Sequence, residues 1–93
     1  MPDNIEVTHL ERLAAELDRR GLSTRLVTTG KRPYLEAASA QSPQLNERVT
    51  CGRADDGAWY HFWSWHQPIG PAGDLDAVAA KIAAVLRPVE GQA

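Results

Sequence analysis

The sequence lacks the features that mark secreted, membrane-inserted and strongly charged proteins. Its 93 residues include a single cysteine, which rules out a disulfide within the chain and fits a reducing compartment. No apolar run approaches the roughly 18 residues of a membrane-spanning helix, and the N-terminus carries no signal-peptide pattern. A net charge of −2 creates no field that would attract a polyanion. These absences predict a cytoplasmic protein without a membrane segment.

The length of the chain sets the scale of its core. Ninety-three residues suit one domain with a thin core and modest stability. We therefore predict a single domain over residues 1–93, with an ordered part over 8–87 and flexible ends at 1–7 and 88–93.

An amphipathic helix is predicted over residues 8–20. Thr8 and Glu11 match a capping box, and Gly21 stands where a left-handed residue often ends a helix. Between them, apolar residues recur with the spacing of one helical face: Leu10, Leu13, Ala14 and Leu17.

A second helix is predicted over residues 75–87. Asp74 is suited to cap its N-terminus, Asp76 favours the helix dipole, and Pro88 ends the helix. Its apolar face consists of Leu75, Val78, Ala79, Ile82, Val85 and Leu86.

The stretch 58–66 holds all three tryptophans and is predicted to be a strand, because bulky aromatic side chains fit a pleated, half-buried surface. Residues 55–57 (Asp-Asp-Gly) before it form a three-residue hairpin turn, in which the glycine supplies the positive φ. This turn pairs the stretch with a strand over 45–53. In the resulting register Cys51 faces His61, and Val49 faces Trp63.

A first hairpin is predicted from a strand over 24–29, rich in β-branched residues, and a two-residue turn at Gly30 and Lys31. In its register two leucines, Leu26 and Leu35, face each other on one side of the hairpin. An oppositely charged pair, Arg25 and Glu36, faces each other on the other side. Residues 67–73 contain two prolines and two glycines, so no regular structure is predicted there.

The expected fold class is α+β, with elements in the order α-β-β-β-β-α. Two amphipathic helices need an apolar surface, and a four-stranded antiparallel meander offers one. We predict a two-layer sandwich with both helices on the face that carries Leu26, Leu35, Val49, Trp59 and Trp63.

The opposite face of this sheet is the first candidate for function. By the register it presents Val27, Tyr34, Tyr60 and Phe62, set among Arg25, Glu36, Arg48 and Thr50. A contiguous exposed aromatic patch on a small domain marks a partner site, and tyrosine and phenylalanine are typical interface residues. The alternatives are a solvated face with scattered aromatics, or a register shifted by one residue.

A second candidate lies at the end of the aromatic strand. Trp65 and His66, followed by Ile69 in a rigid proline–glycine loop, would line a small-molecule pocket. In the alternative, Trp63 belongs to the core and Ile69 folds back to cover it.

Neither a metal site nor a nucleophile is predicted. Cys51 and His61 face each other, but a zinc site needs three or four ligands and the spacing gathers no others. A nucleophilic cysteine would also need an activating base and an oxyanion site. A buried free cysteine is the commoner arrangement, so we assign no catalytic residue and no cofactor.

A basic cluster near the first hairpin raises nucleic-acid binding as a lesser alternative. It comprises Arg19, Arg20, Arg25, Lys31 and Arg32. Acidic residues interrupt it, the chain is net acidic, and no RNA-binding motif accompanies it. A solvated helix end, where arginines complement the dipole, explains it as well.

Three segments resemble those of small actinobacterial proteins of unassigned function: residues 32–35 (Arg-Pro-Tyr-Leu), 49–51 (Val-Thr-Cys) and 63–70, which spells Trp-x-Trp-x-x-Pro-Ile-Gly. The resemblance covers most of the chain and implies no activity, cofactor or catalytic residue. The helix–meander–helix order is also similar to secretion-chaperone-like folds, which dimerise and hold protein partners.

These observations favour a non-enzymatic interaction or accessory module, a homodimer or a subunit bound to another protein, that acts through the aromatic open face. The alternatives are a small-molecule binder or small enzyme that uses the Trp65 pocket, and nucleic-acid binding.

Overall fold

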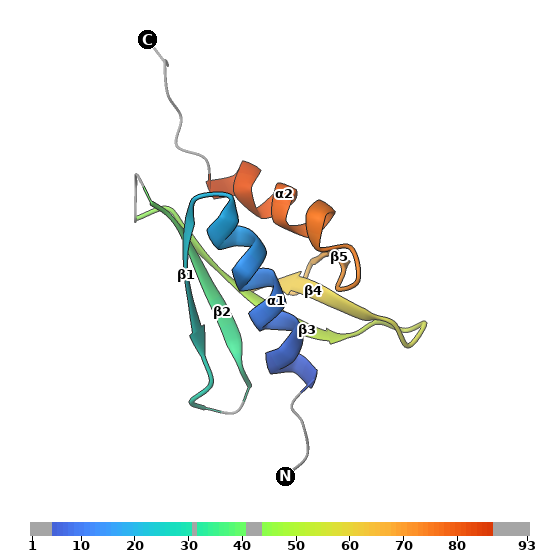
Figure 1. Cartoon of the computed structure of the whole chain (residues 1–93). Helices are drawn as coiled ribbons and strands as arrows, with labels where there is room; N and C mark the ends of the chain where they lie inside the picture. The colour runs from blue at the N-terminus through green and yellow to red at the C-terminus, as the bar shows by residue number, and fades with distance from the viewer. Residues whose placement is uncertain (1–4, 31, 41–43, 87–93) are drawn as a thin grey trace.

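Seven helices and strands make up the part of the chain that the structure describes, which is residues 5–30, 32–40 and 44–86 of a computed structural model. They follow in the order α1 (Ile5–Arg19), β1 (Leu22–Val27), β2 (Tyr34–Ser39), β3 (Asn46–Arg53), β4 (Trp59–Trp63), β5 (Pro68–Pro71) and α2 (Leu75–Leu86). The strands form one antiparallel meander, and both helices pack on the same face of it (Figure 1). The predicted α+β class is confirmed, with five strands rather than four.

Helix α1 starts earlier than its sequence pattern indicated. It begins at Ile5, so Thr8 lies within the helix and the predicted capping box was wrong. The predicted flexible segment 1–7 is helical from Ile5, and its first four residues lie outside the described chain. At the other end Gly21 has a φ of +88°, which confirms the left-handed termination.

Helix α2 begins as the sequence predicted. The backbone amide of Ala77 donates to Oδ1 of Asp74 at 3.2 Å, so Asp74 caps the helix. The helix is described to Leu86, and the predicted stop at Pro88 lies outside the described residues.

The register of the first four strands follows the turns that the sequence predicted. Strand β1 pairs with β2 so that Leu26 faces Leu35, and β3 pairs with β4 so that Cys51 faces His61. In the second hairpin Gly57 has a φ of +84°, which fixes the three-residue turn. In the first hairpin the paired residues end at Val27 and Tyr34, so both strands are shorter at the turn than predicted.

Strand β5 corrects the prediction that residues 67–73 are irregular. Strand β4 ends at Trp63, three residues before the predicted end, and the chain reverses through a tight turn in which His66 has a φ of +67°. Residues 68–71 then pair with β4, with a register shift between His61 and Phe62. Proline is tolerated because β5 is an edge strand, whose outer side needs no donor.

The core lies between the two helices and the inner face of the sheet. Its buried residues come from every element except β1 and include Leu10, Leu13 and Leu17 of α1, Leu35, Val49, Trp63 and Ile69 of the sheet, and Val78, Ile82 and Leu86 of α2. Leu26 and Trp59 are partly buried and pack against it, which confirms the face assigned from sequence.

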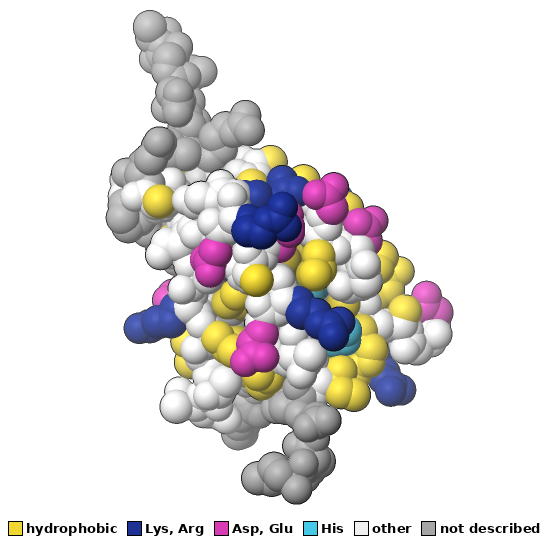
Figure 2. Space-filling view, in the orientation of Figure 1, with side chains coloured by type: hydrophobic (Ala, Val, Ile, Leu, Met, Phe, Trp, Pro, Cys, Tyr) yellow, Lys and Arg dark blue, Asp and Glu magenta, His cyan; other side chains and the backbone are white. Residues whose placement is uncertain are grey.

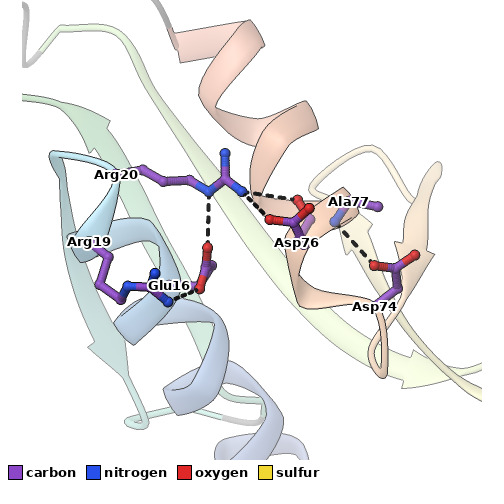
Figure 3. A network of polar contacts seen from close by, with 6 residues as sticks. All are labelled: Glu16, Arg19, Arg20, Asp74, Asp76 and Ala77. Carbon is purple, nitrogen blue, oxygen red and sulfur yellow. Dashed lines mark hydrogen bonds and ion pairs between the residues drawn. The ribbon is translucent and has the colours of Figure 1, made fainter.

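A polar network joins the two helices at the surface (Figure 3). Arg20, just after α1, donates to Glu16 on its own helix and to Asp76 in the first turn of α2. The Asp76 side chain is 86% exposed, so this bridge contributes at most about 1 kcal/mol, and the helices are held together mainly by their shared apolar contacts.

Neither described helix has the length and apolarity that a membrane crossing requires. The expectation that residues 1–93 form a single domain stays a prediction, because the two ends of the chain lie outside the described residues.

Candidate interaction surface on the open sheet face

The candidate site is the sheet face that points away from both helices, which we call the open face. Because side chains alternate along a strand, its members follow from the observed register. They are Ser23, Arg25 and Val27 of β1, Tyr34, Glu36 and Ala38 of β2, Asn46, Arg48, Thr50 and Gly52 of β3, Tyr60 and Phe62 of β4, and Pro68 and Pro71 of β5. The structure thus brings all six predicted interface residues, Val27, Tyr34, Tyr60, Phe62, Arg25 and Arg48, onto one surface.

Tyr60 and Phe62 form an aromatic pair on this face. Their ring centroids lie 6.5 Å apart with an interplanar angle of 46°, a tilted geometry that aromatic pairs favour. Both side chains are half-buried. Gly52 stands opposite Tyr60 on β3, and a Cβ there would lie 3.7 Å from Cε1 of Phe62. The same Cβ would lie 3.5 Å from Nη2 of Arg32, so the edge of the Phe62 ring and the Arg32 guanidinium both border this position.

An open pocket of about 460 Å³ adjoins the aromatic pair. Its lining residues come from the end of β3, the hairpin turn and the two last strands: Arg53, Ala54, Asp55, Tyr60, Phe62 and Pro68. The pocket therefore combines two aromatic rings and a proline with one charge of each sign at its rim. A partner side chain that enters it would find apolar walls and a polar edge, which is how interfaces are commonly built.

Sequence reasoning missed four of the residues that line this pocket: Arg53, Ala54, Asp55 and Pro68. Pro68 was not predicted because no regular structure is expected for residues 67–73, whereas the proline lies opposite Phe62 in the β4–β5 pair. A signal was present in the sequence, since prolines that flank two small apolar residues are compatible with a short edge strand.

The charged residues of the open face are held in place by their neighbours. The Arg25 guanidinium lies 3.5 Å from Oε1 of Glu36 across the β1–β2 pair. The Arg48 guanidinium carbon lies 4.8 Å from the centre of the Tyr34 ring, a cation–π distance. A smaller polar hollow of about 330 Å³ lies toward the other end, lined by Ser23, Thr24, Arg25, Glu36, Ala38 and Asn46. One end of the face is thus aromatic and the other polar.

The pair Cys51 and His61 lies on the opposite, buried side of the sheet. Cys51 is 1% exposed, and burial, reinforced by Glu6 and opposed by Arg32, raises the pKa of its thiol to about 12. A thiol with this pKa stays protonated and is a poor nucleophile at neutral pH. In the described part of the chain, no three His, Cys, Asp or Glu side chains are grouped as a metal ion would need.

His61 is buried as a neutral side chain. It is 0% exposed, and neither ring nitrogen has a hydrogen-bond partner among the described residues. Burial, and secondly the neighbouring His9, lower its pKa to about 4. The backbone of Thr50 opposes this shift, but it forms no hydrogen bond of ordinary geometry with the ring. We therefore regard His61 as a core residue.

The three residues of the predicted small-molecule pocket do not share one environment. Ile69 is 2% exposed and belongs to the core, whereas Trp65 is 52% exposed and His66 is exposed in the β4–β5 turn. The Trp65 ring stacks on Trp63, with centroids 5.2 Å apart and an interplanar angle of 4°, and its Nε1 donates to Gln67. Trp65 is therefore a fixed, exposed ring, and neither pocket described above includes it.

The basic cluster near the first hairpin is largely neutralised. Its described members form ion pairs with carboxylates: Arg19 and Arg20 with Glu16, Arg25 with Glu36, and Arg32 with Glu6. Lys31 lies outside the described residues. On the helix side of the molecule basic and acidic side chains are interspersed (Figure 2). On this side, the described side chains do not form the continuous positive surface that phosphate backbones need.

Comparisons of the chain with protein families, with curated proteins and with solved structures found no match.

Proposed function

We propose that this protein is a non-enzymatic interaction module, and that its open face binds a protein partner through Tyr60, Phe62 and Tyr34. One observation carries the proposal. The open face presents the aromatic pair Tyr60 and Phe62 beside an open pocket. Neither ring belongs to the core, which the two helices and the inner face of the sheet form. Half-buried aromatic rings that the core does not need are the usual anchors of protein interfaces.

The chemistry of the surface also supports a protein partner. Aromatic rings and prolines form the centre, and arginines held by Glu36 and Tyr34 lie beside them, which matches the composition of interface centres and rims. The chain has a single cysteine, Cys51, which is buried and has no partner for a disulfide within the chain, and this supports the cytoplasm as the compartment.

The proposal is tested by cross-linking from the aromatic pair. A photoreactive benzophenone residue in place of Phe62 is compared with the same residue in place of Ala84, which is exposed on α2. Both proteins are illuminated inside cells that produce the chain naturally, and adducts are identified by mass. We expect a defined protein adduct from position 62 that is absent from position 84.

The energetic test uses the partner so identified. Tyr60→Ala combined with Phe62→Ala is expected to weaken binding at least tenfold, equivalent to about 1.4 kcal/mol, because truncated anchors of this kind dominate interface energy. Val85→Ala is the matched control, since Val85 is an apolar residue 50% exposed on α2. Equal affinities of the double variant, the control and the wild type, with unfolding curves unchanged, would remove the open face as the binding site.

A second candidate function is favoured by Trp65. Its exposed ring, fixed by stacking on Trp63 and by the Gln67 hydrogen bond, is a surface on which a planar small molecule would stack. Tryptophan fluorescence of wild type and Trp65→Leu is titrated with a panel of aromatic metabolites. Quenching in the wild type alone supports this function, and the absence of any response removes it.

A further inference from the structure

The two edges of the sheet differ in what they offer to another strand. Strand β5 has four residues, and two of them, Pro68 and Pro71, have no N–H to donate. Strand β1 has six residues, no proline and a single charged side chain, Arg25. In the described sheet β1 pairs only with β2. Proteins shield long edge strands with prolines, charges or covering segments. The prolines therefore protect β5, whereas no other described strand covers the outer edge of β1.

We propose that β1 is a self-association edge, to which a second copy of this chain adds its own β1 in antiparallel orientation. The result is a two-fold symmetric dimer with a continuous ten-stranded sheet. A strand identical to β1 is the simplest partner for it, because a symmetric interface pairs one surface with itself. Strand β5 cannot serve as the partner edge, since its two prolines interrupt the donors of the new ladder.

The sequence of β1 is complementary to itself in one register. Residues that face each other across an antiparallel pair point to the same side of the sheet, so only registers that match side with side are allowed. Two of the allowed registers bring five residues of each strand into pairs, one with its two-fold axis at Thr24 and one with its axis at Arg25. A two-fold axis at Arg25 would set Arg25 against its own copy, which is unfavourable for like charges.

The other register has its axis at Thr24 and avoids this conflict. It places Leu22 against Leu26 of the second copy on the helix side, Thr24 against Thr24, and Ser23 against Arg25 on the open side. Leu22 and Leu26 are only partly buried in one chain and already pack against its core. Their pairing would extend both cores across the new edge, and threonine pairs are favourable cross-strand neighbours.

Two sets of like charges approach the axis in this register, and each already has a partner within its own chain. The Arg25 guanidinium lies 3.5 Å from Glu36. Asp18 of α1 accepts a hydrogen bond of 2.8 Å from the hydroxyl of Thr24. The remaining repulsion is between exposed groups and is screened by salt, so the dimer should tighten modestly as the ionic strength rises.

The test uses charge variants of Ser23, which is exposed and has no role in the core. Ser23→Lys sets a lysine against Arg25 of the second copy, and Ser23→Glu sets a glutamate there. The two side chains are similar in size and opposite in charge. Ala58→Lys, in the β3–β4 turn, is the control for added positive charge. Light scattering and sedimentation over a hundredfold concentration range measure the dissociation constant of each full-length protein against the chain mass of 10.2 kDa.

We expect the wild type and Ala58→Lys to dimerise alike, Ser23→Lys to raise the dissociation constant at least tenfold, and Ser23→Glu to lower it. Combining Ser23→Lys with Arg25→Gln removes the like-charge pair between the two copies and should recover part of the lost affinity. Tyr60→Ala with Phe62→Ala should leave the dimer intact, which separates this edge from the open face. A wild type that is monomeric throughout, a Ser23→Lys protein that dimerises like the wild type, or a dimer lost only in the aromatic variant would overturn the proposal.

Discussion

The buried, neutral side chain of His61 predicts how the free energy of unfolding depends on pH. Burial and the neighbouring His9 lower its folded-state pKa from 6.5 to about 4. Between these two values the unfolded chain binds a proton that the folded chain excludes, so stability must fall as the pH falls through this window. The difference of about 2.5 pH units, at about 1.4 kcal/mol per unit, corresponds to roughly 3.5 kcal/mol.

A loss of this size is large for a chain of this length, whose whole stability is of the order of 5–15 kcal/mol. The assay is urea unfolding, followed by tryptophan fluorescence, at a series of pH values from 7 to about 4. His61→Gln replaces the ring with a neutral group that does not titrate. Acid also acts on other groups of the chain, so the informative quantity is the difference in the free energy of unfolding between the wild type and the variant.

We expect the two stability curves to converge as the pH falls, because the variant lacks the proton that destabilises the wild type. His66→Gln, at an exposed position in the β4–β5 turn, is the control for replacing a histidine outside the core. His61→Leu provides a second variant, since a ring without hydrogen-bond partners should be replaceable by an apolar side chain at little cost. Parallel curves for the wild type and both His61 variants would refute the buried, neutral histidine.

Three further predictions concern the thiol, a helix cap and the tryptophans. Cys51 should resist alkylation at neutral pH and react at the ordinary thiol rate only in urea, because burial keeps it protonated, and a thiol-reactive dye measures both rates. Asp74→Ala should lower the free energy of unfolding by about 1 kcal/mol through loss of the α2 cap, as measured by urea unfolding. Trp63→Ala should cost about 3–5 kcal/mol in the same assay, and Trp65→Ala much less, because the first ring is 8% and the second 52% exposed.

The turns explain why so much of the fold was predictable. Gly57 and Gly21 both take a positive φ, and each sits where a short-range sequence rule requires it. Once the 55–57 turn was located, the alternation of side chains fixed which residues of the third and fourth strands face inward. The register grouped the residues of these strands by side, and the more apolar side was assigned to the core, which left Tyr60 and Phe62 on the open face.

The end of the aromatic strand was less predictable, for a local reason. The chain turns back after Trp63 because His66 adopts a left-handed φ, a conformation that is uncommon for residues other than glycine and that the sequence does not advertise. Pro68 and Pro71 predict an interruption of regular structure, yet both lie in β5. An edge strand tolerates proline because its outer side has no ladder partner that needs a donor. Both errors concern the β4–β5 hairpin, and because of them Pro68 was not among the predicted site residues.

The edge and the face proposals have a joint geometric consequence. In a dimer paired through β1, the two copies of β4 are separated by seven strand spacings, and each spacing is about 4.8 Å. The two aromatic pairs would then lie about 34 Å apart on one side of a continuous sheet, somewhat less if the sheet twists strongly. A surface of this kind suits a partner that is itself dimeric or repeats its epitope, because a second contact within one complex is governed by effective concentration. Dimerisation through an edge that leaves the open faces free would thus convert one modest aromatic patch into a bivalent binding surface.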